Sequence, residues 1–153
     1  MRKQQRIAEV FVCRAGTFLI LQRASGRGKG WWMPPGGNIE DDEDSGDAAI
    51  RETLEETGLR IAQVDLLRCY RWQHPDDSYT RDVTTFIAAA PYGDVRLSDE
   101  HLAYAWTTPE DYVERFWSKR LEELAPDYAG MFREERASAA EVARRFDSVA
   151  LPP

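Results

Sequence analysis

Three glutamates, Glu52, Glu55 and Glu56, lie close together in a segment that has the composition of a helix. Their spacing of i, i+3 and i+4 puts all three carboxylates on one face of an α-helix. Like charges at this spacing repel one another by roughly 0.2–0.5 kcal/mol per pair. The face is therefore either dissolved in water, with Arg51 and Arg60 as partners, or it holds a cation. Carboxylate oxygens are hard ligands, so such a cation would be Mg²⁺ or Mn²⁺ rather than zinc.

The helix that presents these glutamates is predicted between an acidic loop and Gly58. Its alanines and charged residues favour a helix, and glycine is the residue expected just past a helix end. On the face opposite the carboxylates, Ile50, Leu54 and Thr57 are expected to point into a core.

The glutamates belong to a longer pattern. Gly37 is followed after five residues by Glu43, and after seven more by the run RETLEE (51–56), with Gly58 and Leu59 one residue later. This pattern resembles the Nudix box, the signature of the Nudix hydrolases, and all seven fixed residues of that signature fall at the family's spacing. Thr53 stands where the family usually has an aliphatic residue.

The resemblance implies a fold and a reaction. The Nudix fold is α/β, an α/β/α sandwich with a mixed β-sheet against which the box forms a loop–helix–loop. Nudix hydrolases mostly cleave a nucleoside diphosphate linked to another group. Water attacks a phosphorus atom, and a divalent metal such as Mg²⁺ or Mn²⁺ neutralises charge and lowers the pKa of the water.

Roles for the box residues also follow from the resemblance. Glu55 and Glu56 are the expected metal ligands, and Glu52 is either a ligand or the base that takes a proton from the water. Arg51 and Glu43 correspond to the family's internal ion pair, which fixes the loop against the helix.

Residues outside the helix are expected to complete the site. A backbone carbonyl of the glycine turn, at Gly36, is often a further metal ligand in the family. Glu100 lies in a segment similar to one in nucleoside triphosphate-cleaving members, and it either reaches the metal or is a loop carboxylate. Arg23 either contacts substrate phosphate or ends a strand in solvent. One of Trp31 and Trp32 could stack on a base, and the other would then be core.

The sequence leaves three functions open. The segment around Glu100 favours a nucleoside triphosphate, (d)NTP, which would be cleaved to a monophosphate and pyrophosphate. Pro75, downstream of the box, resembles a feature of the ADP-ribose-cleaving branch, so ADP-ribose or another nucleotide sugar is the alternative substrate. A non-catalytic nucleotide-binding sensor is the alternative of another class, but such proteins typically have a degraded box, and this box is intact.

Strands and helices are predicted on both sides of the box. A hairpin is expected from residues 7–13 and 17–23, and further strands over 61–72, 81–90 and 98–107. A helix is predicted from about 109 to 124, ended by Pro126, and another over 138–147, where Ser138 and Glu141 fit a capping box.

The whole chain, residues 1–153, is predicted to be one domain, because its length suits a single core. The resemblance covers about residues 6–112. The helical tail, 113–153, is interpreted as an extension of the same domain that could cap the cleft, support a homodimer or pack on the sheet.

Composition argues against several partners. The chain has 20 Lys and Arg against 27 Asp and Glu, a formal charge of −7, which disfavours a nucleic-acid polymer or an anionic membrane as partner. No apolar run is long enough to cross a bilayer, and the N-terminus does not have the pattern of a signal peptide, so a cytoplasmic location is expected. In that reducing setting Cys13 and Cys69 are expected to be buried thiols, and His74 and His101 loop or packing residues.

Overall fold

The computed structural model describes residues 3–117 and 119–148 of the chain. Within these residues the strands form one seven-stranded sheet with the order β3-β2-β1-β6-β5, in which β4 pairs with β1 and β7 with β2. Their bounds are β1 Lys3–Arg14, β2 Thr17–Arg23, β3 Trp32–Met33, β4 Gly36–Asn38, β5 Asp65–Gln73, β6 Tyr79–Ala89 and β7 His101–Thr107. Because β1 and β6 run parallel while the other pairs are antiparallel, the sheet is mixed, as predicted.

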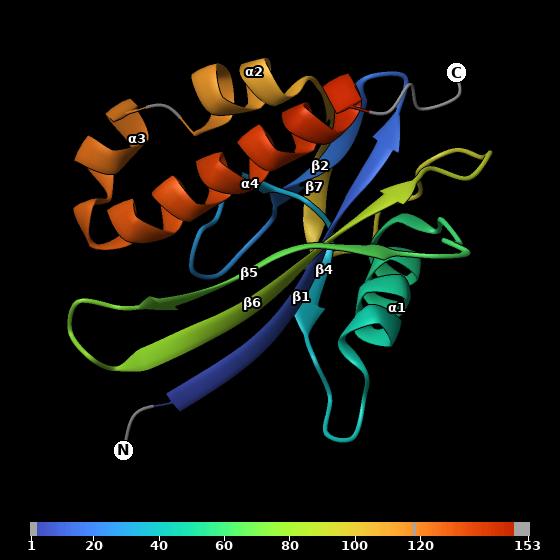
Figure 1. The fold of residues 1–153 in the computed structure, drawn as a ribbon. Coiled ribbons are helices and arrows are strands. Elements are labelled where there is room, and N and C mark those ends of the chain that lie inside the picture. The colour runs from blue at the N-terminus through green and yellow to red at the C-terminus, as the bar shows by residue number, and fades with distance from the viewer. Residues whose placement is uncertain (1–2, 118, 149–153) are drawn as a thin grey trace.

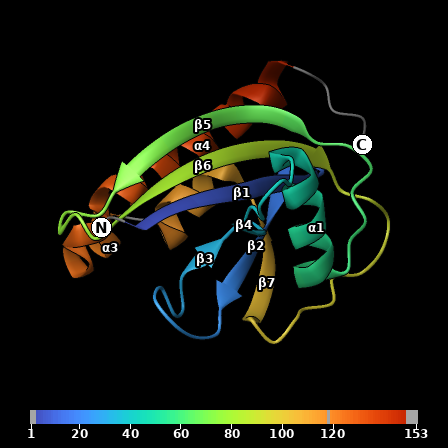
Figure 2. The same cartoon turned by 90° about the horizontal axis from the view of Figure 1, so that it is seen from below.

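Helices cover both faces of this sheet (Figures 1 and 2). Helix α1, Ser45–Thr57, lies on one face, and the long helix α4, Ala129–Ser148, lies on the other with the short helices α2, Pro109–Asp111, and α3, Lys119–Leu124. The molecule is thus the three-layered α/β/α arrangement expected from the sequence.

Alternation along β1 divides the core into two clusters. Val10 and Val12 point towards α1, whereas Phe11 and Cys13 join Trp117 and other buried residues on the α4 side. Since both faces are covered, β1 and β2 are apolar nearly throughout their central parts. The predicted hairpin between them is confirmed, with Ala15 and Gly16 at positive φ in its turn.

The helix predicted over 109–124 is not continuous. It is divided into α2, a π-turn over Tyr112–Phe116 and α3, and Trp117 leaves helical geometry at φ −125° and ψ 41°. The indole of Trp117 is fully buried and donates from Nε1 to the carbonyl of Trp32 at 2.9 Å. The break in the helix thus coincides with the burial of this ring. Pro126 follows the end of α3, as predicted.

The predicted last helix is much longer than the sequence indicated, and its predicted cap was wrong. Ser138 lies inside α4, fully buried, and its Oγ accepts from Nη1 of Arg68 at 3.0 Å. Glu141 pairs with Arg144 and Arg145 farther along the helix instead of closing a cap. The tail therefore packs on the sheet, which was one of the three roles considered for it.

The face of α1 that enters the core was only partly predicted. Thr57 is fully buried as expected, but Ile50 and Leu54 are half-buried, and Thr53 and Glu56 are buried in their place. Thr53 can be buried because its hydroxyl donates to the carbonyl of Ala49 at 2.8 Å. The helix is thus rotated so that one of the three glutamates, Glu56, faces the sheet.

The two cysteines differ. Cys13 is buried as predicted, and burial raises the pKa of its thiol to about 12. Cys69 is exposed, contrary to the prediction, because on the edge strand β5 it points away from the α4 side, where Trp72 is buried. Within the described ranges, no helix combines the length and apolar composition needed to cross a bilayer.

Candidate active site

The glycine turn brings two strands and a helix into close contact. Strand β4 pairs with β1 so that Gly36 lies opposite Glu9. A Cβ on Gly36 would lie 2.5 Å from the carbonyl oxygen of Ala8, and a Cβ on Gly37 would lie 2.5 Å from the carboxyl carbon of Glu52. Only glycine leaves room for the neighbouring backbone at the first position and for a carboxylate at the second.

Glu56 is held against this turn. Its Oε1 accepts a hydrogen bond from the backbone N–H of Gly36 at 2.9 Å, and only 4% of the residue is exposed. Burial raises the pKa of Glu56 to about 8, although the Gly36 N–H opposes the shift; the nearby carboxylates of Glu52 and Glu100 add to it. The charge of Arg23 also opposes the shift but does not cancel it.

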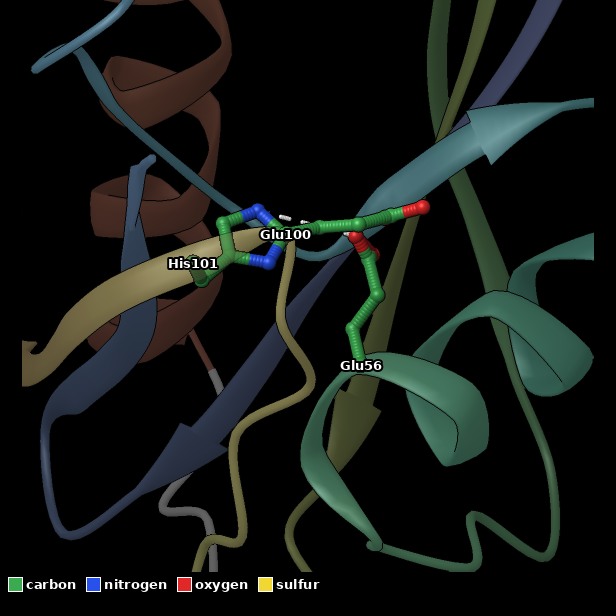
Figure 3. Close-up of side chains that lie close together, drawn as sticks. All are labelled: Glu56, Glu100 and His101. Atoms are coloured by element: carbon green, nitrogen blue, oxygen red, sulfur yellow. Dashed lines mark ion pairs between the residues drawn. The ribbon is translucent and has the colours of Figure 1, made fainter. Parts of the chain in front are cut away.

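Glu100 and His101 approach Glu56 from the other side of the cleft (Figure 3). They lie at the start of β7, which pairs with β2 so that His101 is opposite Arg23. One ligand atom from each of Glu56, Glu100 and His101 lies within 4.8 Å of the others. His101 Nε2 is 3.6 Å from Glu56 Oε2, and burial lowers the pKa of His101, which favours the neutral imidazole. The cluster thus combines carboxylate oxygens with an imidazole nitrogen.

Arg51 lies behind the cluster and connects the loop to the helix. Its Nε and Nη2 donate to the two oxygens of Glu43 at 2.8 and 2.9 Å, and Nη2 also donates to the carbonyl of Asn38 at 3.1 Å. This bidentate pair holds the pKa of Glu43 down at about 2. Nη1 of Arg51 donates to Glu52 at 3.0 Å and lies 3.3 Å from Glu55. The geometry is that of the internal ion pair which the resemblance implied.

The three box glutamates share a helix face but differ in environment. Glu56 is buried, and the side chain of Glu52 is 14% exposed and lines the cleft. The side chain of Glu55 is 58% exposed, lies beside Arg51 and does not line the cleft. Burial raises the pKa of Glu52 while Arg51 opposes the shift, so Glu52 also lies where a carboxylate is poorly compensated. The structure brings Glu52, Glu56 and Glu100 to the cleft and leaves Glu55 nearer to solvent.

The cleft itself has a volume of about 780 Å³ and runs from the acidic cluster to the α4 side of the sheet. Arg23 lines it at the end of β2 and is the cation that lowers the pKa of Glu56. Trp31 also lines the cleft, with its ring 5.2 Å from that of Tyr128. Trp32 packs against Phe116 at 5.3 Å, so of the two tryptophans Trp31 is the one that faces the cleft.

Sequence reasoning missed several residues of the site. His101 was interpreted as a loop or packing residue, although it directly follows Glu100. Glu9, Arg81 and Tyr128 line the cleft from β1, β6 and the 3₁₀ turn that precedes α4, and they were not considered. A buried charged residue within an apolar strand, such as Glu9 in IAEVFVC, was the one signal that could have identified them.

The site has the donor set and charge that a hard divalent cation requires. The carboxylates of Glu52, Glu56 and Glu100 line the same cleft, and burial, followed by repulsion from the other two, raises the pKa of Glu56. Arg51 contacts Glu52 and Glu55 from the helix side, and it shares its hydrogen bonds between these two glutamates and the loop residues Glu43 and Asn38. Oxygen-rich, negatively charged sites of this kind suit Mg²⁺ or Mn²⁺.

Comparison with known proteins agrees with the fold and the box. A family model described as NUDIX domain matches residues 3–133. A MutT-like protein of Streptomyces ambofaciens is 34% identical over 111 residues, 71% of this chain and 66% of that protein. An asymmetrical bis(5′-nucleosyl)-tetraphosphatase of Mus musculus is 33% identical over 61% of this chain and 65% of its own length. The chain thus spans slightly less than two thirds of these two relatives.

Two further known proteins match this chain over a larger share of their own length. The nucleoside triphosphatase NudI of Escherichia coli is 29% identical over 72% of this chain and 86% of that protein. The crystal structure of a MutT protein of Methanosarcina mazei superposes with a TM-score of 0.69 at 23% identity, over 88% of this chain and 96% of that chain, which supports the fold. Since the family model covers most of the residues and includes the whole box, this chain belongs to the NUDIX domain family.

Proposed function

We propose that this chain is a divalent-metal-dependent pyrophosphohydrolase that cleaves a nucleoside diphosphate linked to another group. The observation that carries the proposal is the carboxylate of Glu56, buried at the end of a cleft beside Glu52 and Glu100, with a pKa of about 8. Burying a carboxylate beside two others is costly unless a cation compensates it. Membership of the NUDIX domain family and relatives named as phosphoanhydride-cleaving enzymes support the same conclusion.

Glu56, Glu52 and Glu100 would hold the Mg²⁺ or Mn²⁺, with Glu55 and the carbonyl of Gly36 as the further ligands that the family resemblance implies. The ion would supply charge neutralisation between the diphosphate oxygens and a lower pKa for the attacking water. His101 lies beside these carboxylates with a neutral imidazole, so its nitrogen is available to the same site.

The chain's own residues orient the substrate and accept a proton. Arg23, across the strand pair from His101, is positioned to bind phosphate oxygens near the bond that is cleaved. A bond forms between the water oxygen and phosphorus, the anhydride P–O bond breaks, and the water proton passes to a carboxylate. Glu52 suits this role, because burial raises its pKa towards neutrality, but the same carboxylate could instead serve as a ligand.

A nucleoside triphosphate, cleaved to a monophosphate and pyrophosphate, is the proposed substrate. Glu100 supports it, because the segment that resembled triphosphate-cleaving members does contribute a carboxylate to the cleft. ADP-ribose or another nucleotide sugar is the alternative, and its sequence support, Pro75, is exposed and does not line the cleft. A non-catalytic nucleotide sensor would not need the fully formed Arg51–Glu43 pair or the convergent carboxylates.

A panel of nucleoside triphosphates, dinucleoside polyphosphates, ADP-ribose and nucleotide sugars, incubated with Mg²⁺ and analysed by ion chromatography, tests these alternatives. Release of pyrophosphate from triphosphates supports the leading proposal. Tight binding of a nucleotide without turnover of any compound would instead favour the sensor. Light scattering of the purified chain at several concentrations tests whether it forms a homodimer.

The part played by Glu100 needs its own variant. Glu100→Gln should raise the Mg²⁺ concentration needed for half-maximal rate, because one carboxylate of the cluster is lost. An unchanged rate at limiting Mg²⁺ would show that Glu100 is only a loop carboxylate.

A further inference from the structure

The cleft has a second polar region, on the α4 side of the sheet. Parallel pairing of β1 with β6 places Gln5 opposite Arg81 and Glu9 opposite Thr85. Glu9 and Arg81 both line the cleft, together with Met131 of α4. This region contains none of the proposed metal ligands, and neither the fold nor the hydrolytic site accounts for it.

The carboxyl group of Glu9 lies against another buried carboxyl group. It hydrogen-bonds to Glu135, which is fully buried and also accepts from the hydroxyls of Tyr70 at 3.1 Å and Tyr112 at 3.2 Å. Two carboxyl groups can hydrogen-bond only if a proton lies between them. The Oε1 atom of Glu9 is buried and has no hydrogen-bond partner among residues 3–117 and 119–148.

Arg81 has an unpaired hydrogen-bond donor that complements the unpaired acceptor of Glu9. Its Nε is also buried and lacks an acceptor within the described part of the chain. Its Nη1 donates to Sδ of Met131 at 3.0 Å, and a thioether is a weak acceptor on a flexible side chain. Buried polar atoms are nearly always paired, so an orphaned acceptor and an orphaned donor on neighbouring strands indicate a missing partner.

The walls around these two atoms are aromatic. Trp31, Tyr79 and Tyr128 line the same part of the cleft. The guanidinium carbon of Arg27 lies over the ring of Tyr79, 5.1 Å from the ring centroid. Flat rings suit the face of a planar heterocycle, while an acceptor beside a donor suits its edge. Met131 can move aside to admit such a group, because its side chain has several rotatable bonds.

We propose that Glu9 and Arg81 form a subsite for the hydrogen-bonding edge of a nucleobase, with Glu9 Oε1 accepting from an N–H group and Arg81 Nε donating to the adjacent acceptor. The inference rests on the proposed function, since it assumes that the ligand of the cleft is a nucleotide. It adds that the chain discriminates between bases by a donor beside an acceptor, rather than by stacking on a tryptophan alone.

Paired nucleotides test this subsite. ATP presents an amino donor beside the N1 acceptor, and ITP presents an N1–H donor beside a carbonyl, whereas purine riboside 5′-triphosphate lacks the donor altogether. Wild type should favour ATP or ITP over the purine compound by about 10- to 100-fold in kcat/KM, the cost of leaving a buried polar group unpaired. Because the readout is a ratio on one preparation, loss of folded protein does not alter it.

Variants distinguish a role of Glu9 and Arg81 in base recognition from a role in folding. Glu9→Leu and Arg81→Leu should bring the ratio close to unity. Glu9→Gln should retain it, because the Glu135 carboxylate selects the orientation in which the amide donates to it and leaves the amide oxygen facing the cleft. Arg71→Leu, which removes an exposed arginine that pairs with Asp82, is the matched control and should leave the ratio unchanged. An equal ratio in wild type and Glu9→Leu would overturn the subsite.

Calorimetric binding of AMP, IMP and purine riboside 5′-monophosphate without metal keeps this proposal distinct from the proposed function. A base preference in binding that Glu9→Leu abolishes, without turnover of any triphosphate, supports the subsite and refutes the hydrolase. Turnover of triphosphates without any base preference supports the hydrolase and refutes the subsite. Absence of both binding and turnover for every nucleotide would overturn both.

Discussion

Two groups of carboxylates in this molecule are compensated in different ways. At the end of the cleft beside α1, burial and the neighbouring carboxylates of Glu52 and Glu100 raise the pKa of Glu56, while the backbone N–H of Gly36 donates to it. On the α4 side, Glu9 and Glu135 are buried more completely, and burial raises the pKa of both. There, however, hydroxyls of Tyr70 and Tyr112 donate to Glu135, so the pair is largely satisfied by the protein.

This difference indicates what each group needs from outside. A shared proton and two tyrosines compensate the Glu9–Glu135 pair, while Oε1 of Glu9 has no partner within the described residues. In that same part of the chain no comparable set of hydroxyl donors reaches the cleft carboxylates, which agrees with the cation proposed for them. Glu135 thus belongs to a hydrogen-bonded network of the core, whereas Glu56 belongs to the proposed metal site, and substitutions should separate the two.

The largest effect is expected from Glu56→Gln. Losing this ligand should lower kcat about 10³-fold, because the bound ion supplies several kcal/mol of transition-state stabilisation. Stability of the metal-free protein at pH 7 should not fall, since the amide removes a carboxylate that is costly to bury. Hydrolysis assays over a Mg²⁺ titration measure kcat, and chemical denaturation in the presence of a chelator measures the stability of the metal-free protein. Wild-type turnover would contradict the ligand assignment.

Glu135→Leu should show the opposite combination. Removing the common acceptor leaves Tyr70, Tyr112 and Glu9 unpaired in the core, and breaking such a buried network costs about 3–5 kcal/mol of unfolding free energy. Denaturant unfolding followed by tryptophan fluorescence measures the loss. Glu134→Gln, on the half-exposed ion pair with Arg68, is the control and should change stability by no more than about 1 kcal/mol. Equal effects in both variants would mean that the buried pair is not a structural unit.

The sequence predicted one of these groups and not the other for a physical reason. Glu52, Glu55 and Glu56 are brought together by the local geometry of one helix, so their spacing in the chain determines their proximity. Glu9 and Glu135 meet only because β1 lies under α4, and no local spacing encodes that contact. His101 likewise joins Glu56 through the pairing of β7 with β2.

A contact between segments distant in the chain also explains why the start of the last helix was predicted wrongly. Gly130 lies in the first turn of α4, where a Cβ would lie 2.8 Å from Nε1 of Trp72. The glycine lets α4 approach β5 closely and is kept for packing rather than for a turn. Tertiary contact decided the start of this helix, whereas strand positions and the box followed from local pattern.

A smaller effect is expected from Gly37→Ala, which acts on the cleft carboxylates without removing any. The new methyl group would displace the Glu52 carboxyl, and disturbing the support of a metal ligand typically costs about 10-fold in metal affinity. Mn²⁺ binding followed by calorimetry measures this change. Gly36→Ala is the contrasting variant, because its methyl group meets the backbone of β1 and should destabilise the fold instead. Unchanged Mn²⁺ affinity in Gly37→Ala would exclude Glu52 from the metal site.

Glu43→Gln should give the smallest effect and tests a third way of compensating a carboxylate, by an arginine. Arg51 holds the pKa of Glu43 at about 2, below its ordinary value of 4.5, so the pair stabilises the folded state fully above pH 4.5. This contribution is lost as pH falls towards 2, because Glu43 is then protonated in both states. The variant should therefore melt below wild type at pH 7, and the two curves should converge near pH 2 in calorimetry. Glu40→Gln, whose side chain is 69% exposed and 3.9 Å from Arg51, should show no such convergence. A constant difference at every pH would mean that Glu43 acts through packing and not through its charge, and that only the first two ways of compensation operate in this protein.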